Sequence, residues 1–268
     1  IVPQGSEAAQ GTQVLLQGKP LGAGEIGLLA SVGRSEISVA RRPRIAILPT
    51  GDEIVPPDRE PEWYQIRNSN AAALGAQVSV AGGEPVQLGI GPDQYDPLKK
   101  MVQKGLEEDL LVVSGGVSAG KYDIVEKVLA DLDAEFHFTG VALRPGKPLV
   151  FGQVGRRFFF GVPGNPVSTF VTFEMFVRPA LEILCGAPSR EPTFLRACLA
   201  STVSMKGGLT AFVPARLFES ERQPVVELVP SEGSGDLVGL AKANCFVVVH
   251  PEQTTLLAGT WVDIYPKQ

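Results

Sequence analysis

Between residues 44 and 188, short apolar runs alternate with stretches in which apolar residues recur every three or four positions. The apolar runs have the length and composition of buried strands. We expect such strands at RIAIL (44–48), QVSVA (77–81) and DLLVV (109–113). We expect one helix to start at NSNAAALGA (68–76) and a second to cover YDPLKKMVQKGLEE (95–108). A third should follow Asp123, and its apolar face is formed by Ile124, Val125, Val128, Leu129 and Leu132. Strands and helices in this order predict an α/β domain with a mainly parallel sheet.

The second half of the chain changes its pattern twice. Residues 148–164 read as a hairpin around Gly155, and residues 165–184 as a long helix with Asn165 as N-cap and Pro166 in its first turn. Pro179 should kink this helix or shift its register. After residue 188 the helical period stops and short strands recur, which predicts a small all-β domain, a sandwich or a barrel. These strands are expected in AFVPARLF, PVVELVP, CFVVVHP and WVDIYPK.

The pattern gives three segments: residues 1–43, 44–188 and 189–268. The first is rich in glycine and holds too little apolar sequence for a core of its own. We therefore expect it to be the remnant of a larger N-terminal domain, in a chain that starts inside that domain.

Composition excludes several classes of function. The chain has 268 residues, 44% hydrophobic and 20% charged, with 29 acidic and 24 basic residues and no sustained basic run, so a nucleic-acid partner is not expected. No apolar stretch approaches the roughly 20 residues that span a membrane. The three widely spaced cysteines predict neither a disulfide framework nor a zinc site and fit a cytoplasmic protein with reduced thiols. Because the chain has only two histidines, both in predicted strands, a His-based triad or metal centre is not expected.

The segment GGVSAGK (115–121) closely resembles the P-loop motif that binds nucleotides. A P-loop continues with a Ser or Thr whose hydroxyl holds Mg²⁺, whereas this chain has Tyr122, followed by Asp123. A carboxylate is a suitable Mg²⁺ ligand, so the segment predicts an anion-binding loop of another kind. The alternative is that the glycines form a plain turn and Asp123 caps the next helix.

Polar residues follow every strand predicted in the α/β domain. In open α/β sheets, ligands bind beyond the carboxyl ends of the strands, so these residues should meet at one edge. They are Thr50-Gly51-Asp52-Glu53, Asp93, Ser114-Gly115-Gly116 with Asp123, Arg144 and Lys147, and Pro163-Gly164-Asn165 with Ser168. Taken singly, each is also an ordinary turn or helix start. Together, carboxylates beside cations and a helix N-terminus predict a divalent metal, Mg²⁺, between the acids and a phosphorylated or pyrophosphate substrate.

Five ordered segments and the tail resemble one known family. ILPTGDE, IRNSNAAAL, LLVVSGGVSAGKYD, LRPGKPLVFG and GVPGNPVSTFVTFE, followed by SEGSGDLVGLAKANCFVVV and LLAGTWVDIYP, are similar in order and spacing to the molybdopterin molybdenumtransferases, known as MoeA in bacteria and as the gephyrin E domain in animals. The resemblance covers essentially the whole chain. It implies a three-layer α/β/α molybdopterin-binding domain with a C-terminal barrel-like domain.

The resemblance also implies an activity and a site. The family inserts molybdate, its substrate, into adenylylated molybdopterin, with metal-dependent release of AMP, usually as a homodimer. By position, Asp123 and Asp93 would hold the metal, and Glu53 and Lys147 would join them as catalytic residues. The implied substrate-binding residues are Thr50, Gly51, Asp52, Asn68, Asn70, Ser114, Gly115, Gly116, Ser118, Arg144, Pro163, Gly164, Asn165, Ser168 and Ser234. Implied partners are the adenylyltransferase that acts one step earlier and the enzymes that receive the cofactor.

The chain departs from the family pattern in three places. Arg144 stands where the family has the first Lys of K-P-G-K, and Pro214 stands where an anion-binding Arg is frequent, with Arg216 two positions later. The long upstream region of the family is represented only by residues 1–43.

Two other functions stay open. One is the related adenylyltransferase activity, whose proteins usually lack the β tail and carry G-G-T-G where this chain has Gly115-Gly116-Val117-Ser118. The other is a non-catalytic pterin-binding or scaffolding module, which would have no need to crowd carboxylates at one edge.

Overall fold

The computed structural model describes residues 2–116, 124–189, 191–220 and 223–267. Its central feature is a six-stranded sheet in the order β4-β1-β5-β9-β8-β6. The strands are β1 (Arg44–Pro49), β4 (Glu84–Gln87), β5 (Leu110–Ser114), β6 (Glu135–Phe138), β8 (Val150–Val154) and β9 (Arg157–Val162). Strands β4, β1, β5 and β9 are parallel to one another, whereas β8 runs antiparallel to both β9 and β6. The predicted mainly parallel sheet and the hairpin at Gly155 are confirmed.

Helices cover both faces of this sheet. One face packs against α2 (Asn70–Val80), α6 (Arg178–Leu184) and the segment η1 (Phe173–Val177) that joins α5 (Pro166–Thr172) to α6, and the other face packs against α3 (Tyr95–Gly105) and α4 (Ile124–Ala130). Strand β1 serves both layers, because Ile45 and Ile47 belong to one buried cluster while Ala46 and Leu48 belong to the other. Since both faces are covered, the strand reads as a continuous apolar run, and the predicted α/β/α layering is confirmed.

The predicted strand at residues 77–81 is wrong. Residues 77–80 form the last turn of α2, and the second parallel strand is β4. Leu74 and Val78, four residues apart, are fully buried in the same cluster, which is the helical spacing. Packing of this face onto the sheet outweighs the strand preference of the two valines.

The long helix predicted at residues 165–184 is present but divided. Asn165 is the N-cap of α5, a π-helical segment follows (η1, Phe173–Val177), and α6 begins at Arg178 with Pro179 in its first turn. Proline lacks the amide that would continue the preceding hydrogen-bond register. The register shift predicted from Pro179 is therefore confirmed, and it lies just before the proline.

The C-terminal strands form a closed barrel. Its order is β13-β10-β16-β14-β12, and β12 pairs again with β13. The strands are β10 (Leu195–Leu199), β12 (Thr210–Ser220), β13 (Gln223–Leu228), β14 (Cys245–Val249) and β16 (Trp261–Pro266). Two short strands, β11 (Val203–Ser204) and β15 (Thr255–Leu256), pair beside it, and α7 (Leu237–Lys242) lies between β13 and β14 in the chain. Of the two predicted β architectures, the structure has the barrel.

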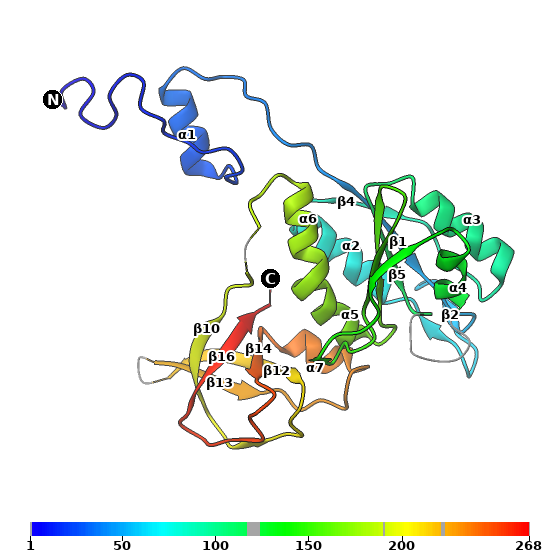
Figure 1. Ribbon diagram of the computed structural model, residues 1–268. Coiled ribbons are helices and arrows are strands. Elements are labelled where there is room, and N and C mark those ends of the chain that lie inside the picture. Colours follow the sequence, from blue (N-terminus) through cyan, green and yellow to red (C-terminus); the bar gives the residue numbers. More distant parts are fainter. Residues whose placement is uncertain (1, 117–123, 190, 221–222, 268) are drawn as a thin grey trace.

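The barrel and the α/β domain are joined by a strand and by an apolar interface. Strand β7 (Leu143–Arg144) leaves the α/β domain and pairs in parallel with the start of β12. Val167 and Val171 of α5 pack with Phe212 and Phe246 of the barrel in one buried cluster. Figure 1 shows α5 and α7 between the two domains.

The N-terminal segment adds little to either core. Its helix α1 (Ala23–Ser31) has no buried residue and lies apart from the sheet in Figure 1. The segment is attached near Arg41, whose guanidinium forms two hydrogen bonds, of 2.6 and 2.5 Å, with the carboxylate of Asp109. No helix of the described residues is long and apolar enough to cross a membrane.

Candidate active site

The floor of the candidate site is a buried cluster of polar groups at the carboxyl ends of β1, β5 and β9. The side-chain amide of Asn70 donates to the hydroxyl of Ser114 at 2.9 Å and to the carbonyl of Gly164 at 2.7 Å. Thr50, Asn70 and Ser114 are all less than one tenth exposed. Among the described residues, Thr50 Oγ1 and Asn70 Oδ1 have no hydrogen-bond partner. Because buried polar atoms are normally paired, these two oxygens are available to a ligand.

The turn after β5 comes so close to β1 that it needs glycine. A Cβ added to Gly115 would lie 2.7 Å from the carbonyl oxygen of Thr50, and the φ angle there is +90°. Gly116 also has a positive φ, of 61°. The turn thus places backbone against the floor where a side chain would block it. Residues Ser118 and Asp123, assigned to this loop by the sequence, lie outside the described residues.

Acidic side chains form the rim next to this floor. The backbone amide of Asp93 donates to Asp52 Oδ1 at 3.0 Å, and the amide of Asp52 lies 3.4 Å from Asp93 Oδ2. Glu53 folds back over Gly51, because a Cβ added to Gly51 would lie 2.7 Å from both carboxylate oxygens. Asp52, Glu53 and Asp93 are exposed to solvent, so three of the predicted acids are brought to the end of β1.

The rim suits a hard divalent cation in its donor chemistry. Mg²⁺ prefers oxygen ligands and is commonly held by one or two carboxylates, together with water and substrate phosphates. The neighbouring carboxylates of Asp52 and Asp93 fit this requirement, and each has an oxygen free of the backbone hydrogen bonds described above. Within the described part of the chain, no group of three or more His, Cys, Asp or Glu residues forms a complete metal site.

The barrel contributes one residue to the rim. Asn165 Nδ2 donates to Ser234 Oγ at 2.9 Å, and the amide of Val167 donates to the carbonyl of Ser234, also at 2.9 Å. The Asn165 side chain makes no capping bond within α5 and reaches across to the barrel instead. The expected approach of Ser234 to the α/β domain is confirmed, although its role towards substrate stays a prediction.

The cationic turn after β7 packs on α5. A Cβ added to Gly146 would lie 2.5 Å from the Thr172 side chain and 3.8 Å from the carbonyl oxygen of the buried Ser168. Arg144 donates to the carbonyl of Lys206 in the barrel domain, and its Nε is buried without a partner among the described residues. The side chain of Lys147 is exposed. Arg144 is thus engaged with the barrel through one nitrogen, and its role towards an anion stays a prediction.

The other predicted residues hold the local backbone. Asn68 Oδ1 accepts the amide of Ala71 at 3.0 Å in the first turn of α2, and the carbonyl of Pro163 accepts the hydroxyl of Thr169. On β12, Pro214 is buried and Arg216 is exposed opposite Glu227 of β13. Whether Arg216 replaces an anion-binding Arg stays a prediction.

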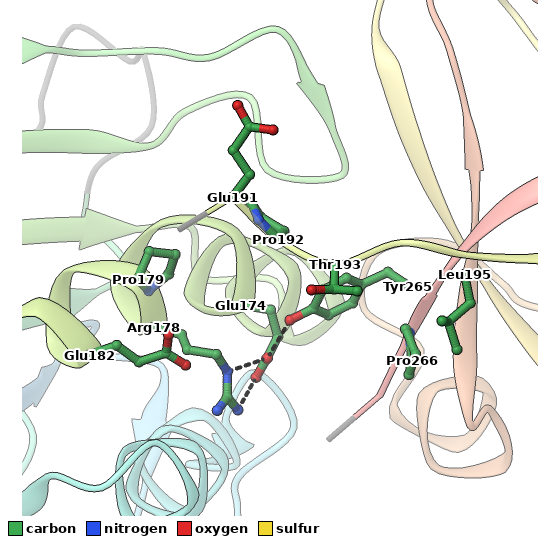
Figure 2. Close-up of a pocket in the computed structure, with 10 residues that line it drawn as sticks. All are labelled: Glu174, Arg178, Pro179, Glu182, Glu191, Pro192, Thr193, Leu195, Tyr265 and Pro266. Atoms are coloured by element: carbon green, nitrogen blue, oxygen red, sulfur yellow. Dashed lines mark hydrogen bonds and ion pairs between the residues drawn. The ribbon is translucent and has the colours of Figure 1, made fainter. Parts of the chain in front are cut away.

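Sequence reasoning missed a second polar cluster, between η1, α6 and the barrel. Glu174, which is 1% exposed, accepts hydrogen bonds of 2.6 and 3.0 Å from Arg178, 2.7 Å from Gln77 and 3.1 Å from the hydroxyl of Tyr265. Burial, followed by the charge of Glu174, raises the pKa of Tyr265, so its hydroxyl stays protonated and donates. Glu174, Arg178 and Tyr265, drawn in Figure 2, line a cavity of about 230 Å³. The available signal was Glu174 and Arg178 at i, i+4 spacing in an otherwise apolar helix.

Two family models match the chain, one for each domain. Residues 46–183 match a probable molybdopterin-binding domain. Residues 196–267 match the MoeA C-terminal region, domain IV.

Curated relatives and solved structures agree with these matches. A molybdopterin molybdenumtransferase of a Nostoc species is 36% identical over 255 residues, 93% of this chain and 58% of the relative. Its counterpart from Staphylococcus aureus is 33% identical over 267 residues, 97% of this chain and 62% of the relative. A molybdopterin biosynthesis MoeA protein from Pyrococcus horikoshii superposes with a TM-score of 0.83 at 28% identity, covering 97% of this chain and 63% of that one. The chain therefore spans about three fifths of the length of these relatives.

Proposed function

Since the chain belongs to the molybdopterin-binding domain family and joins that domain to a MoeA C-terminal region, we propose that it is a molybdopterin molybdenumtransferase. In the proposed reaction, water cleaves the phosphoanhydride of adenylylated molybdopterin and AMP leaves. The two dithiolene thiols of the pterin replace an oxygen of molybdate, which leaves with their protons as water. The related adenylyltransferase activity fits less well, because the C-terminal barrel would have no part in it.

The proposal rests on one observation: buried polar atoms without partners and acidic side chains lie together at one edge of the sheet. Asn70 Oδ1 is an acceptor and requires a donor, which a pterin ring has in its N–H groups and a fully ionised phosphate lacks. Thr50 Oγ1 can donate or accept. The floor therefore suits the ring of the substrate, and the rim of Asp52, Glu53 and Asp93 suits its metal-bound phosphates.

The residues at this edge take distinct parts in the reaction. Thr50 and Asn70 bind and orient the pterin, and the Gly115-Gly116 turn lets the substrate approach the backbone. Asp93, with Asp123, would hold Mg²⁺, which would neutralise charge on the phosphoanhydride and ease departure of AMP. Lys147 would attract molybdate or phosphate to the turn beside Ser168 as a mobile point charge. Asn165 and Ser234 keep the barrel in place over the start of α5.

The proposal includes partners of the whole protein. We expect a homodimer that receives its substrate from an adenylyltransferase and passes the finished cofactor to molybdoenzymes. These assemblies rest on the family alone.

A single-turnover assay tests the activity. The chain is mixed with adenylylated molybdopterin and Mg²⁺, with and without molybdate, while AMP release and protein-bound molybdenum are followed. We expect molybdate-dependent AMP release that Asp123→Asn and Asp93→Asn each abolish, with Asp96→Asn, an acid in the first turn of α3, as the matched control. Substrate binding without AMP release, unchanged when more Mg²⁺ or another divalent metal is added, would refute the transferase. A scaffold would bind the pterin equally well in all three variants.

A further inference from the structure

Two neighbouring aromatic side chains protrude from the surface next to the candidate site. Trp63 is 95% exposed and Tyr64 is 50% exposed. Their rings meet edge to face, with centroids 5.5 Å apart at an interplanar angle of 71°. Tryptophan is usually well buried, so an almost fully exposed indole on an ordered part of a protein calls for a ligand.

The loop that carries these rings starts and ends at residues of the candidate site. The amide of Ile66 donates to the carbonyl of Glu53 at 2.8 Å, and the amide of Asn68 donates to the carbonyl of Val55 at 2.8 Å. These bonds close β2 (Ile54–Val55) against β3 (Ile66–Arg67). In Figure 1, β2 lies at the end of the sheet where β1 finishes. The aromatic pair therefore belongs to the same end of the sheet as the acidic rim.

The tip of the loop is held in a defined turn. The amide of Gln65 donates to the carbonyl of Glu62 at 2.9 Å, and the amide of Glu62 donates to Gln65 Oε1 at 3.1 Å. These two bonds enclose Trp63 and Tyr64. Glu60 is paired with Arg67 of β3 at 3.1 Å. The rings are thus presented by a structured turn, which lowers the ordering cost of binding.

The charges of the loop decide which part of a substrate the rings can meet. Its acidic residues Asp58, Glu60 and Glu62 outnumber Arg59, the one basic residue between positions 56 and 65. Phosphate or molybdate would be repelled by these carboxylates. A flat uncharged heterocycle would not be repelled, and aromatic side chains stack on such rings regardless of their hydrogen-bond pattern.

We propose that Trp63 and Tyr64 form a stacking platform for a planar heterocycle of the substrate at the rim of the site. The identity of that heterocycle, adenine or pterin, rests on the proposed function, because adenylylated molybdopterin contains both. The platform adds affinity and orients the ring, while the acidic rim and its metal take the phosphates.

Intrinsic fluorescence tests the platform directly, because the chain has only two tryptophans. Trp261→Phe leaves Trp63 as the sole indole, and this protein is titrated with AMP, with a free pterin, and with inorganic pyrophosphate as the ring-free control. We expect saturable quenching by AMP or by the pterin, whichever ring stacks, and none by pyrophosphate. Quenching by neither ring would overturn the proposal.

Affinity measurements separate stacking from a structural effect. Trp63→Ala should weaken binding of the stacking ligand roughly 5- to 150-fold, which corresponds to about 1–3 kcal/mol of base stacking. Trp63→Phe should retain most of the affinity, and pyrophosphate binding should not change in either variant. Trp261→Ala is the matched control, since Trp261 is 46% exposed on β16 of the barrel.

The outcomes distinguish this inference from the proposed function. Unchanged ring affinity in Trp63→Ala with normal AMP release would overturn the platform and leave the transferase intact. Loss of ring affinity in a protein that never releases AMP would support the platform and refute the transferase. An equal loss for pyrophosphate and for the ring ligand would assign Trp63 to the structure of the loop and overturn the proposal.

Discussion

Replacing Arg178 by Met should destabilise the protein strongly, because it removes the counter-charge of a carboxylate that water does not reach. The side chains of Glu174 and Arg178 are 1% and 6% exposed, and they form a two-pronged pair within 3.0 Å. Methionine has a similar length and fills the space of the aliphatic part, so the cavity contribution is small. What remains is a buried anion held by Gln77 and Tyr265 alone.

The magnitude follows from the cost of breaking a buried pair. Removal of one partner typically costs about 3–5 kcal/mol, because the remaining charge stays buried without compensation. The two neutral donors that remain place the expected loss at the lower end, about 3 kcal/mol. The double replacement Glu174→Gln with Arg178→Met removes the charge and keeps an acceptor for Gln77 and Tyr265. The double variant should therefore be only about 1–2 kcal/mol less stable than the parent, because the amide donors of the introduced glutamine have no partners.

Urea denaturation at pH 7 measures both variants against the parent chain. The midpoint should fall most in Arg178→Met and recover in the double variant, while the m-value stays constant if unfolding remains cooperative. A loss below about 1 kcal/mol in Arg178→Met, or a double variant no more stable than the single one, would refute the assignment of a buried, mutually dependent pair.

Two further changes test the site floor and the attachment of the N-terminal segment. In urea denaturation, Gly115→Ala should cost about 2–4 kcal/mol of stability, because φ is positive there and the new Cβ would meet the carbonyl of Thr50. The control Gly155→Ala should cost only about 1–2 kcal/mol, because φ there is +59° but no atom lies within 4 Å of the new Cβ. Equal losses in the two variants would contradict the close approach of Gly115 to Thr50. The hydrogen-bonded Arg41 lowers the pKa of Asp109 from 3.8 to about 2, so the stability that Asp109 provides is present above about pH 4 and is lost as the pH falls towards 2. Asp109→Asn should therefore lower stability by about 1 kcal/mol at pH 7, given the exposure of Arg41. In thermal melts, most of the difference from the parent should be lost by pH 2, and a difference independent of pH would contradict the pair.

The sheet was predictable because its central strands are buried on both faces. A strand covered on both sides has no polar positions to retain, so β1 and β5 appear in the sequence as unbroken apolar runs. The error at residues 77–81 arose where this signal is ambiguous. Two valines separated by one serine suit a strand as well as a helix, and only the burial of Leu74 together with Val78 decides for the helix.

The site floor was predictable from topology, whereas its connections to the barrel were not. Thr50, Ser114 and Gly164 lie at the carboxyl ends of three neighbouring parallel strands, so their meeting at one edge follows from strand order. Ser234 lies 69 residues from Asn165, and no local pattern relates the two. Only resemblance to a family indicated that Ser234 lies at the site. The hydrogen bond from Tyr265 to Glu174 spans 91 residues and had no such guide.

The barrel contacts two segments of the candidate site, the start of α5 and the cationic turn. Ser234 binds both the side chain of Asn165 and the amide of Val167 at the start of α5. Strand β7 is hydrogen-bonded to β12, and Arg144 at its end donates to the carbonyl of Lys206. A small rotation of the barrel would therefore shift the first turn of α5 and the cationic turn together, while the floor residues Thr50 and Ser114, at the ends of β1 and β5, would stay in place. Because pterin contacts are assigned to the floor and oxyanion contacts to the two turns, changes at this interface should alter molybdate handling before they alter pterin binding.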